Sequence, residues 1–263
     1  MTLTRSTRRE LVGWLQFALF SALVAGGVIY SATRMNYNWR WGEVPRYVLR
    51  IVDGQWIPGP LLKGLAVTLE ISLWSFVCAL VIGLFTALAR LSDSIVARGL
   101  SRVYLEAIRN TPLLVQLYLF YFVFAPILQL DRFAAAVLSL ALFEGAFAAE
   151  IFRAGILAVP KGQPEAAASL GLNRTQTYRF VVLPQALRMM LPPLTSLAVS
   201  LVKHSAIVSV IAVFDLANEA RIVISDTFLT FEIWLTTAAL YLAVTIVLSL
   251  LASRLERRFA RAS

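Results

Sequence analysis

Long apolar segments recur along this chain of 263 residues. A membrane-spanning α-helix needs about 20 mostly apolar residues, and several segments reach or exceed that length. Hydrophobic residues make up 59% of the sequence, which is well above the usage of soluble domains. The sequence therefore predicts an all-α integral membrane protein. About six transmembrane helices are expected, at residues 11–30, 61–91, 111–128, 133–159, 185–214 and 233–252.

The first apolar segment, residues 11–30, resembles both a signal peptide and a retained span, because it follows Arg5, Arg8 and Arg9. It is longer than a typical signal-peptide apolar region, and the residues after it form only a weak cleavage site. We expect a retained span. Residues 1–60 are then a tail, a first span and an extracytoplasmic loop, and residues 61–258 form the main transmembrane domain.

The formal net charge is +9, and its distribution along the chain indicates a topology. If both termini are cytoplasmic, sixteen Lys and Arg residues fall on the cytoplasmic side and six on the other. This asymmetry follows the positive-inside rule, although four arginines within residues 34–50 oppose it. The rule places residues 160–184 in the cytoplasm. Because the positive charge is spread over several loops, no nucleic-acid partner is expected.

Residues 160–184 interrupt the apolar pattern with a polar stretch that reads as two short helices. Pro164 suits the first position of a helix, where a missing N–H has no partner to lose. Glu165 then places a negative charge at the positive end of the helix dipole. Gly171 is suited to the left-handed conformation that ends a helix.

The second helix of this stretch is expected to begin at Asn173. Asn173 followed by Gln176 predicts a capping box, in which each side chain bonds the other residue's backbone N–H. Leu183-Pro184 is expected to end the helix, because proline cannot donate a helical hydrogen bond. Two capped helices between membrane spans suit docking to another protein.

The spacing within this stretch resembles the signature EAA-x3-G-x9-I-x-LP of permease subunits of bacterial ABC importers. Valine stands where isoleucine is usual. Further strings, at 65–72, 109–116, 149–156 and 160–163, resemble the polar amino-acid uptake branch, which includes histidine, glutamine and glutamate/aspartate permeases. The signature residues are Glu165, Ala166, Ala167, Gly171, Val181, Leu183 and Pro184.

The resemblance implies a type I ABC importer permease core of five spans, preceded here by one N-terminal span. Coupling helices at about 161–183 would dock on a cytoplasmic ABC ATPase dimer through Glu165, Ala166, Ala167, Gly171, Leu183 and Pro184. ATP and Mg would bind to that partner, because the chain has no Walker-type phosphate loop and is not expected to be an enzyme or to hold a cofactor. The other implied partners are a second permease subunit, the same or paralogous, a solute-binding protein and the lipid bilayer of the bacterial inner membrane.

Ionisable residues inside spans are costly and usually face a pathway or a partner. Glu144 has no basic neighbour in its own span, so it is a candidate for the substrate pathway; an inter-subunit hydrogen bond is the alternative. Lys203, His204 and Ser205 suggest a cavity wall, although a lone histidine is more often a packed residue. One histidine and one cysteine in the whole chain predict no metal site.

Glu150 and Arg153 are three residues apart on one helix face, so they are expected to form a structural or gate pair. Asn110, Thr111 and Gln116 begin the predicted third span, where gating or packing is favoured over contact with a substrate.

These observations predict a non-catalytic permease subunit that moves a polar amino acid by alternating access. An ion-driven secondary transporter, with Glu144 and Glu150 relaying protons, is the alternative, as is ABC import of another small solute such as an opine. An intramembrane enzyme is disfavoured, because HExxH and GxSxG patterns are missing from the sequence. Glu144 suits a cationic group of the substrate, whereas Lys203 or His204 suits a carboxylate. Residues 215–232 are expected to be an acidic loop. A solute-binding protein is expected to dock on this loop and on residues 31–60 and 129–132.

Overall fold

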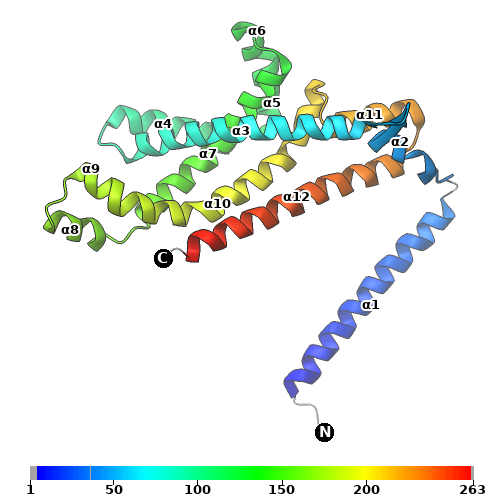
Figure 1. Cartoon of the computed structure of the whole chain (residues 1–263), viewed down its shortest axis with the longest axis horizontal. Helices are drawn as coiled ribbons and strands as arrows, with labels where there is room; N and C mark the ends of the chain where they lie inside the picture. The colour runs from blue at the N-terminus through cyan, green and yellow to red at the C-terminus, as the bar shows by residue number, and fades with distance from the viewer. Residues whose placement is uncertain (1–4, 36, 262–263) are drawn as a thin grey trace. The chain divides into compact units, whose positions relative to one another are not determined.

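The computed structural model describes residues 5–35 and 37–261, which divide into two compact units between Arg40 and Trp41. The first unit is one helix, α1 (Arg5–Arg34). Within it, Val12–Arg34 is long and apolar enough to cross a membrane, as the sequence predicts. The second unit holds the remaining elements (Figure 1).

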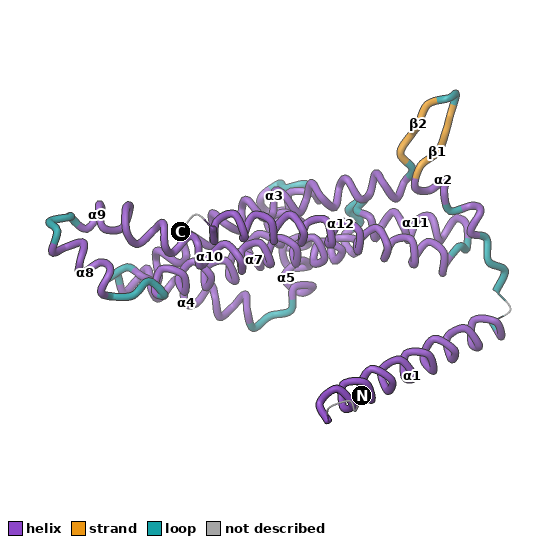
Figure 2. Tube along the Cα trace, turned by 60° about the horizontal axis from the view of Figure 1, so that its bottom comes forward, coloured by secondary structure: helices purple, strands orange, loops and turns teal. Residues whose placement is uncertain are grey.

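The second unit begins with a short 3-10 turn (Trp41–Glu43), helix α2 (Pro45–Val48) and a β-hairpin of β1 (Leu49–Val52) and β2 (Gln55–Pro58). The antiparallel register pairs Leu49 with Pro58 and Val52 with Gln55. Asp53 and Gly54 form the turn, both with positive φ, which is the conformation that Asp-Gly favours in two-residue hairpins. Figure 2 shows this hairpin as the two strands in an otherwise helical trace of the described residues.

Two long helices, α3 (Pro60–Leu91) and α7 (Arg132–Leu157), form the centre of the second unit. Both agree closely with the predicted spans. Small residues allow them to approach: a Cβ added to Gly83 would lie only 2.6 Å from the Cβ of Ala148. Close packing of small residues is the usual way in which helices associate in a bilayer, where apolar surface alone gives no preference for protein over lipid.

The predicted third span, residues 111–128, coincides with the helical stretch Leu113–Leu128, but this stretch is one arm of a sharply bent helix pair. Residues Ile95–Arg109, which lie between the second and third predicted spans, form the other arm, and Leu113–Leu128 leaves it at an angle of 110°. Pro112 causes the break, because it lacks an N–H and disfavours a helical conformation in the preceding residue. Gln116 holds the bend: its Nε2 donates to the carbonyl oxygens of Ile108 (2.7 Å) and Thr111 (3.0 Å). The elements are α4 (Ile95–Arg109), α5 (Leu113–Leu119), a π-helical turn (Phe120–Phe124) and α6 (Ala125–Leu128).

The predicted fifth span also differs from the structure. The α-helix α10 (Leu183–His204) stops before residue 214, and a 3-10 helix (Ser205–Ile211) follows it. Residues 215–232, expected to be an acidic loop, contain the helix α11 (Leu216–Thr227). The expectation was wrong because Asp215 is not a solvated loop residue: it is fully buried and accepts hydrogen bonds from the first backbone N–H groups of α11.

The last helix, α12 (Thr230–Arg261), follows α11 with its first half and α10 with its second half. Ile233 packs with Leu216 in one apolar cluster, whereas Glu256 near the other end contacts Thr195 of α10. The break between α10 and α11 therefore lies part-way along α12, as Figure 1 shows. Broken helices at membrane depth occur where protein or a cavity encloses the irregular backbone.

The backbone at this break is enclosed by the main core. Val208, Ile211 and Val213 are buried with Ile71 of α3 and Leu140 of α7. Arg221 of α11 ties the two sides together, because it donates to the backbone oxygen of Ser209 (2.9 Å) and to Asn218 (2.9 Å).

Candidate functional site

The polar stretch 160–184, called the coupling segment below, folds as a helix-turn-helix. Its first helix is α8 (Gly162–Ser169), and Gly171 ends it with a φ of +80°. Pro164 is the third helical residue and not the first, a position at which a backbone N–H would still lack a partner. The second helix, α9 (Arg174–Thr177), begins with the predicted capping box, in which Asn173 and Gln176 exchange two bonds of 2.9 Å.

Leu183-Pro184 does not end the second helix, contrary to the prediction. A π-helical turn, Tyr178–Val182, joins α9 to α10, and the Leu183 N–H donates to the Tyr178 carbonyl five residues earlier. The wider turn accommodates Pro184, which has no N–H, and Gln185 Nε2 donates to the Val181 carbonyl oxygen (2.8 Å). The coupling segment is therefore continuous with a long apolar helix.

Most of the signature residues lie on the surface of the coupling segment. Glu165, Ala166, Gly171, Leu183 and Pro184 are exposed, while Ala167 is buried. A Cβ at Gly171 would have no atom within 4 Å, so its neighbourhood is open. Beside these residues is a groove of ≈ 440 Å³ lined by Arg174, Thr175, Tyr178, Arg179 and Leu183.

A cluster of buried apolar side chains fixes the coupling segment to the spans. Val159, just before the segment, and Val182, within it, pack with Met190 of α10. Gly155 of α7 makes room for that methionine, because an added Cβ would lie 2.3 Å from Met190 Cγ. The segment therefore rests on the ends of α7 and α10.

Glu144 and His204, two residues proposed separately for the substrate pathway, are in contact. Glu144 is 3% exposed, and its Oε1 lies 2.5 Å from His204 Nδ1. The contact joins α7 to the last residue of α10. His204 remains accessible and also meets the edge of Phe143. The two residues place a carboxylate and an imidazole at the helix break.

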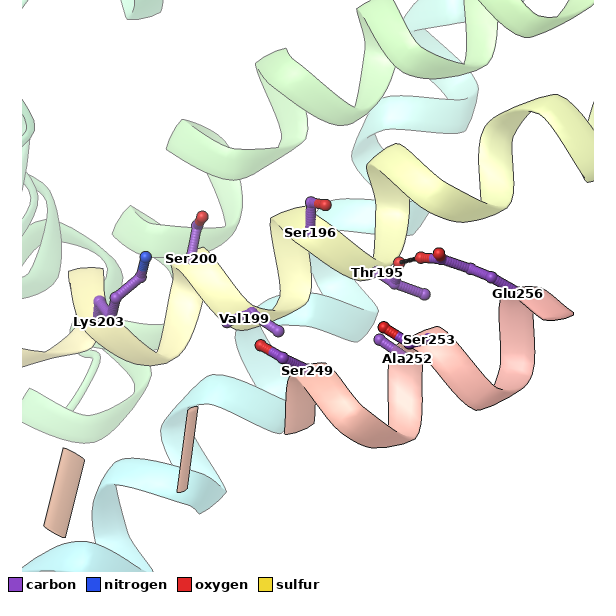
Figure 3. A pocket seen from close by; sticks show the side chains of 9 residues that line it. All are labelled: Thr195, Ser196, Val199, Ser200, Lys203, Ser249, Ala252, Ser253 and Glu256. Carbon is purple, nitrogen blue, oxygen red and sulfur yellow. Dashed lines mark hydrogen bonds between the residues drawn. The ribbon is translucent and has the colours of Figure 1, made fainter. Parts of the chain in front are cut away.

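Lys203 and Ser205 do not join this pair. Ser205 is completely buried and donates to the Val202 carbonyl oxygen (2.8 Å), which is a local helical bond. Lys203 lies beside a groove of ≈ 360 Å³ between α10 and α12, called the α10/α12 groove (Figure 3). The other lining residues carried no sequence signal for a site; they are Thr195, Ser196, Val199, Ser200, Ser249, Ala252, Ser253 and Glu256.

Glu150 and Arg153 are paired at 3.0 Å, and two more arginines join them. Arg90 of α3 bonds the other carboxylate oxygen, and Arg109 of α4 lies 3.9 Å from it. One carboxylate therefore links α3, α4 and α7. The sequence signal for Arg90 and Arg109 was only their shared position near the ends of apolar segments.

Metal-binding groups are not clustered in the described part of the chain: it contains no group of three or more His, Cys, Asp or Glu side chains that could hold an ion. Cys78 is a partly buried free thiol that packs against the main core.

The long apolar helices, one of them continuous with the surface helix-turn-helix, define a multi-pass membrane protein. Among the described residues, five helices are long and apolar enough to cross a membrane, or six if the bent pair α4–α6 counts as one span. The chain belongs to the family described as binding-protein-dependent transport system inner membrane component, which matches residues 79–261. It is thus the permease subunit of an ABC importer in the inner membrane, and ATP hydrolysis belongs to a partner subunit.

Curated relatives share most of this chain. The glutamine transport system permease protein GlnP of Escherichia coli (strain K12) is 40% identical over 201 residues, which cover 75% of this chain and 92% of that protein. The L-cystine transport system permease protein TcyB of Bacillus subtilis (strain 168) is 39% identical over 207 residues, which cover 77% of this chain and 88% of that protein.

Solved structures show the same fold. The crystal structure of an amino acid ABC transporter with histidines matches with a TM-score of 0.71 at 40% identity, covering 76% of this chain and 94% of that one. An inward-facing structure of the MetNI methionine ABC transporter matches with a TM-score of 0.64 at 21% identity, covering 76% of this chain and 96% of that one. As an ABC permease, the chain works with an ATPase and a binding protein.

Proposed function

We propose that this chain moves a polar amino acid across the membrane by alternating access, driven by a separate ATPase that docks on the coupling segment. One observation carries the proposal: the coupling segment runs through a π-helical turn into α10, and the far end of α10 holds His204 against Glu144. A displacement of the coupling segment is therefore transmitted to a polar site at the helix break. Relatives named for glutamine and cystine transport support an amino acid as the substrate.

The exposed residues Glu165, Ala166, Gly171, Leu183 and Pro184 form the surface that the ATPase contacts, and Ala167 supports it from within. Small side chains allow a close approach, and Glu165 lies at the N-terminal turn of α8. ATP and Mg bind on the ATPase dimer, whose closure moves the coupling helices. Glu150, with Arg153, Arg90 and Arg109, keeps α3, α4 and α7 together during this movement.

Both termini are cytoplasmic in this proposal. The asymmetry of Lys and Arg supports that orientation, and six spans result if α4–α6 is one broken span. A second permease subunit, the same or paralogous, completes the pathway. The solute-binding protein docks on the opposite face, at the hairpin of residues 49–58 and near residues 129–132; α11 contributes less, because its Leu216, Ala220 and Val223 are packed inside the molecule.

Glu144, His204 and Lys203 are the polar groups that face the substrate, and the packed Ser205 supports the turn beside them. The rival function is a secondary transporter in which Glu144 and Glu150 relay protons. The contacts of Glu150 favour a structural role, because three arginines surround its carboxylate.

Two substitutions in the coupling segment test the proposal. Glu165→Lys and Gly171→Asp are each expected to lower ATP-driven uptake at least tenfold in the complete transporter, while ATP hydrolysis continues without transport. Membrane insertion should be unchanged, because Glu165 and Gly171 both lie at the exposed surface. Matched controls on α4 are Glu106→Lys and Gly99→Asp, which are also exposed and should transport normally. Normal uptake by both coupling-segment variants would contradict docking at this surface.

A further inference from the structure

The α10/α12 groove has a polar lining that a membrane span facing lipid would not carry. Five hydroxyl groups, one ammonium and one carboxylate occupy one face of α10 and one face of α12. On α12, Ser249, Ser253 and Glu256 recur at helical spacing, so they share a face. Polar and ionisable groups in spans are placed toward water, a solute or a partner, because their exposure to acyl chains is costly.

Most of these polar groups have no partner within the described part of the chain. The hydroxyls of Ser196, Ser200, Ser249 and Ser253 form no hydrogen bond there, although serines in helices commonly bond a preceding carbonyl. Lys203 likewise has no carboxylate within 4.0 Å among the described residues. The groove therefore offers donors and acceptors that its own walls do not satisfy.

Opposite charges stand at the two ends of the groove. Thr195 Oγ1 lies 2.6 Å from Glu256 Oε1 and fixes that carboxylate at one end. Lys203 follows Thr195 by eight residues on α10, a helical rise of roughly 12 Å. Figure 3 shows Ser196, Ser200 and Lys203 pointing to the same side of α10, with the Thr195–Glu256 bond at the far end.

This spacing selects among amino acids. The α-amino and α-carboxylate groups of any amino acid are attached to one carbon atom, so they cannot reach both ends of the groove. A basic amino acid such as arginine carries a second cation at the end of a long side chain. Its carboxylate can pair with Lys203 while its side-chain cation pairs with Glu256 and the α-amino group meets the hydroxyls.

We infer that the α10/α12 groove is a substrate subsite for amino acids with a long basic side chain. The inference rests on the proposed amino-acid transport and names the substrate class of that pathway. Lys203 binds the carboxylate, Glu256 binds the side-chain cation, and Thr195 positions Glu256.

Binding to the permease–ATPase complex in detergent, without the binding protein, tests the inference with radiolabelled L-arginine and L-glutamine. Wild type should bind L-arginine saturably. Glu256→Gln keeps the shape and a hydrogen bond to Thr195, so it should weaken L-arginine binding about 10- to 100-fold, the range for a lost bond to a charged group, and leave L-glutamine binding within about twofold. Glu106→Gln, on the distant α4, should change neither. Lys203→Met should weaken both.

A competition on the wild-type complex avoids any question of variant folding. Agmatine, which is arginine without its carboxylate, should displace L-arginine at least tenfold less well than L-arginine itself. Absence of L-arginine binding to wild type, equal displacement by agmatine, or equal losses of L-arginine and L-glutamine binding in Glu256→Gln would each overturn the inference. The proposed function is tested separately, by ATP-driven uptake of any amino acid in the complete transporter.

Discussion

Asp215 has an unusual position for a carboxylate. It is fully buried at the start of α11, where it accepts hydrogen bonds from the backbone N–H groups of Asn218 (3.0 Å) and Ala217 (3.3 Å). Burial raises its pKa to about 6, although these hydrogen bonds oppose the shift. The folded protein therefore holds the proton of Asp215 more tightly than the unfolded chain does.

The stability of the α11 region should consequently depend on pH. Protonated Asp215 contributes fully to the free energy of unfolding below about pH 4. This contribution falls by up to about 3 kcal/mol as the pH rises through about 6. Asp215→Asn keeps a side-chain oxygen for the cap but cannot ionise. Thermal unfolding in detergent at pH 4.5 and 7.5 should show a smaller loss of stability toward pH 7.5 in the variant. Equal losses of stability in wild type and Asp215→Asn would contradict a raised pKa of Asp215 in the folded protein.

Glu150 is the single carboxylate among three guanidinium groups. Glu150→Gln removes the negative charge and leaves Arg90, Arg109 and Arg153 facing one another across three helices. A loss of about 1–3 kcal/mol in the free energy of unfolding is expected, as for a charged hydrogen bond.

Unfolding by denaturant at low and high salt measures this effect, which should shrink at high salt because screening weakens both attraction and repulsion. Glu106→Gln is the control, since the hydrogen bonds of Glu106 are confined to its neighbour Asn110 among the described residues. Equal stability of the Glu150→Gln variant and wild type would exclude the linking role.

At the scale of elements, the crossing of α3 and α7 depends on glycine. Gly83→Ala would place a methyl group 2.6 Å from the Cβ of Ala148, so it should destabilise the fold by about 1–3 kcal/mol through overpacking. Gly99→Ala on α4 meets nothing within 4 Å and should be neutral or stabilising by up to about 1 kcal/mol, because alanine favours helix.

Melting temperatures of the two alanine variants provide the comparison. A lower value for the Gly83 variant and an unchanged or higher value for the Gly99 variant is the expected pattern. Similar values would show that α3 and α7 can separate at little cost.

Regular spans were predictable from the sequence, whereas the breaks between them were not. Pro60–Leu91 and Arg132–Leu157 match the predicted spans, because uninterrupted apolar composition determines a long helix in lipid. The helix α11 was missed although Asp215, Leu216, Ala220 and Val223 have the spacing of a capped amphipathic helix. The acidic residues of this stretch suggested a loop. The burial of Asp215 depends on packing against α3 and α12, which local sequence does not reveal.

The candidate site was predictable as separate residues but not as contacts. Glu144 and His204 are sixty residues apart in sequence. A polar residue in an apolar span indicates a functional or structural role, but the sequence does not show which residue it contacts. Glu256 was missed because it lies among C-terminal arginines that suggest a lipid interface. Leu183-Pro184 was wrongly predicted to end a helix. A π-helical turn, which has no simple sequence signal, lets the helix continue through the proline.

At the scale of the whole molecule, the second unit connects a surface segment to a polar interior. The coupling segment continues into α10, α10 ends at the Glu144–His204 contact, and the α10/α12 groove runs beside it. In the proposed mechanism, this continuity is the route by which a chain that lacks a phosphate-binding loop uses the energy of ATP hydrolysed by a partner. It also distinguishes the proposed importer from an ion-driven transporter, which needs no coupling surface.

The most direct test is the uptake of radiolabelled amino acids by proteoliposomes that contain this chain with its ATPase and binding protein. ATP is supplied on the side of the coupling segment, and ion gradients are abolished with ionophores. Uptake should require ATP, persist without an ion gradient and fall at least tenfold in Gly171→Asp. Uptake that follows an imposed ion gradient without ATP, and that is unchanged in Gly171→Asp, would contradict the proposed mechanism.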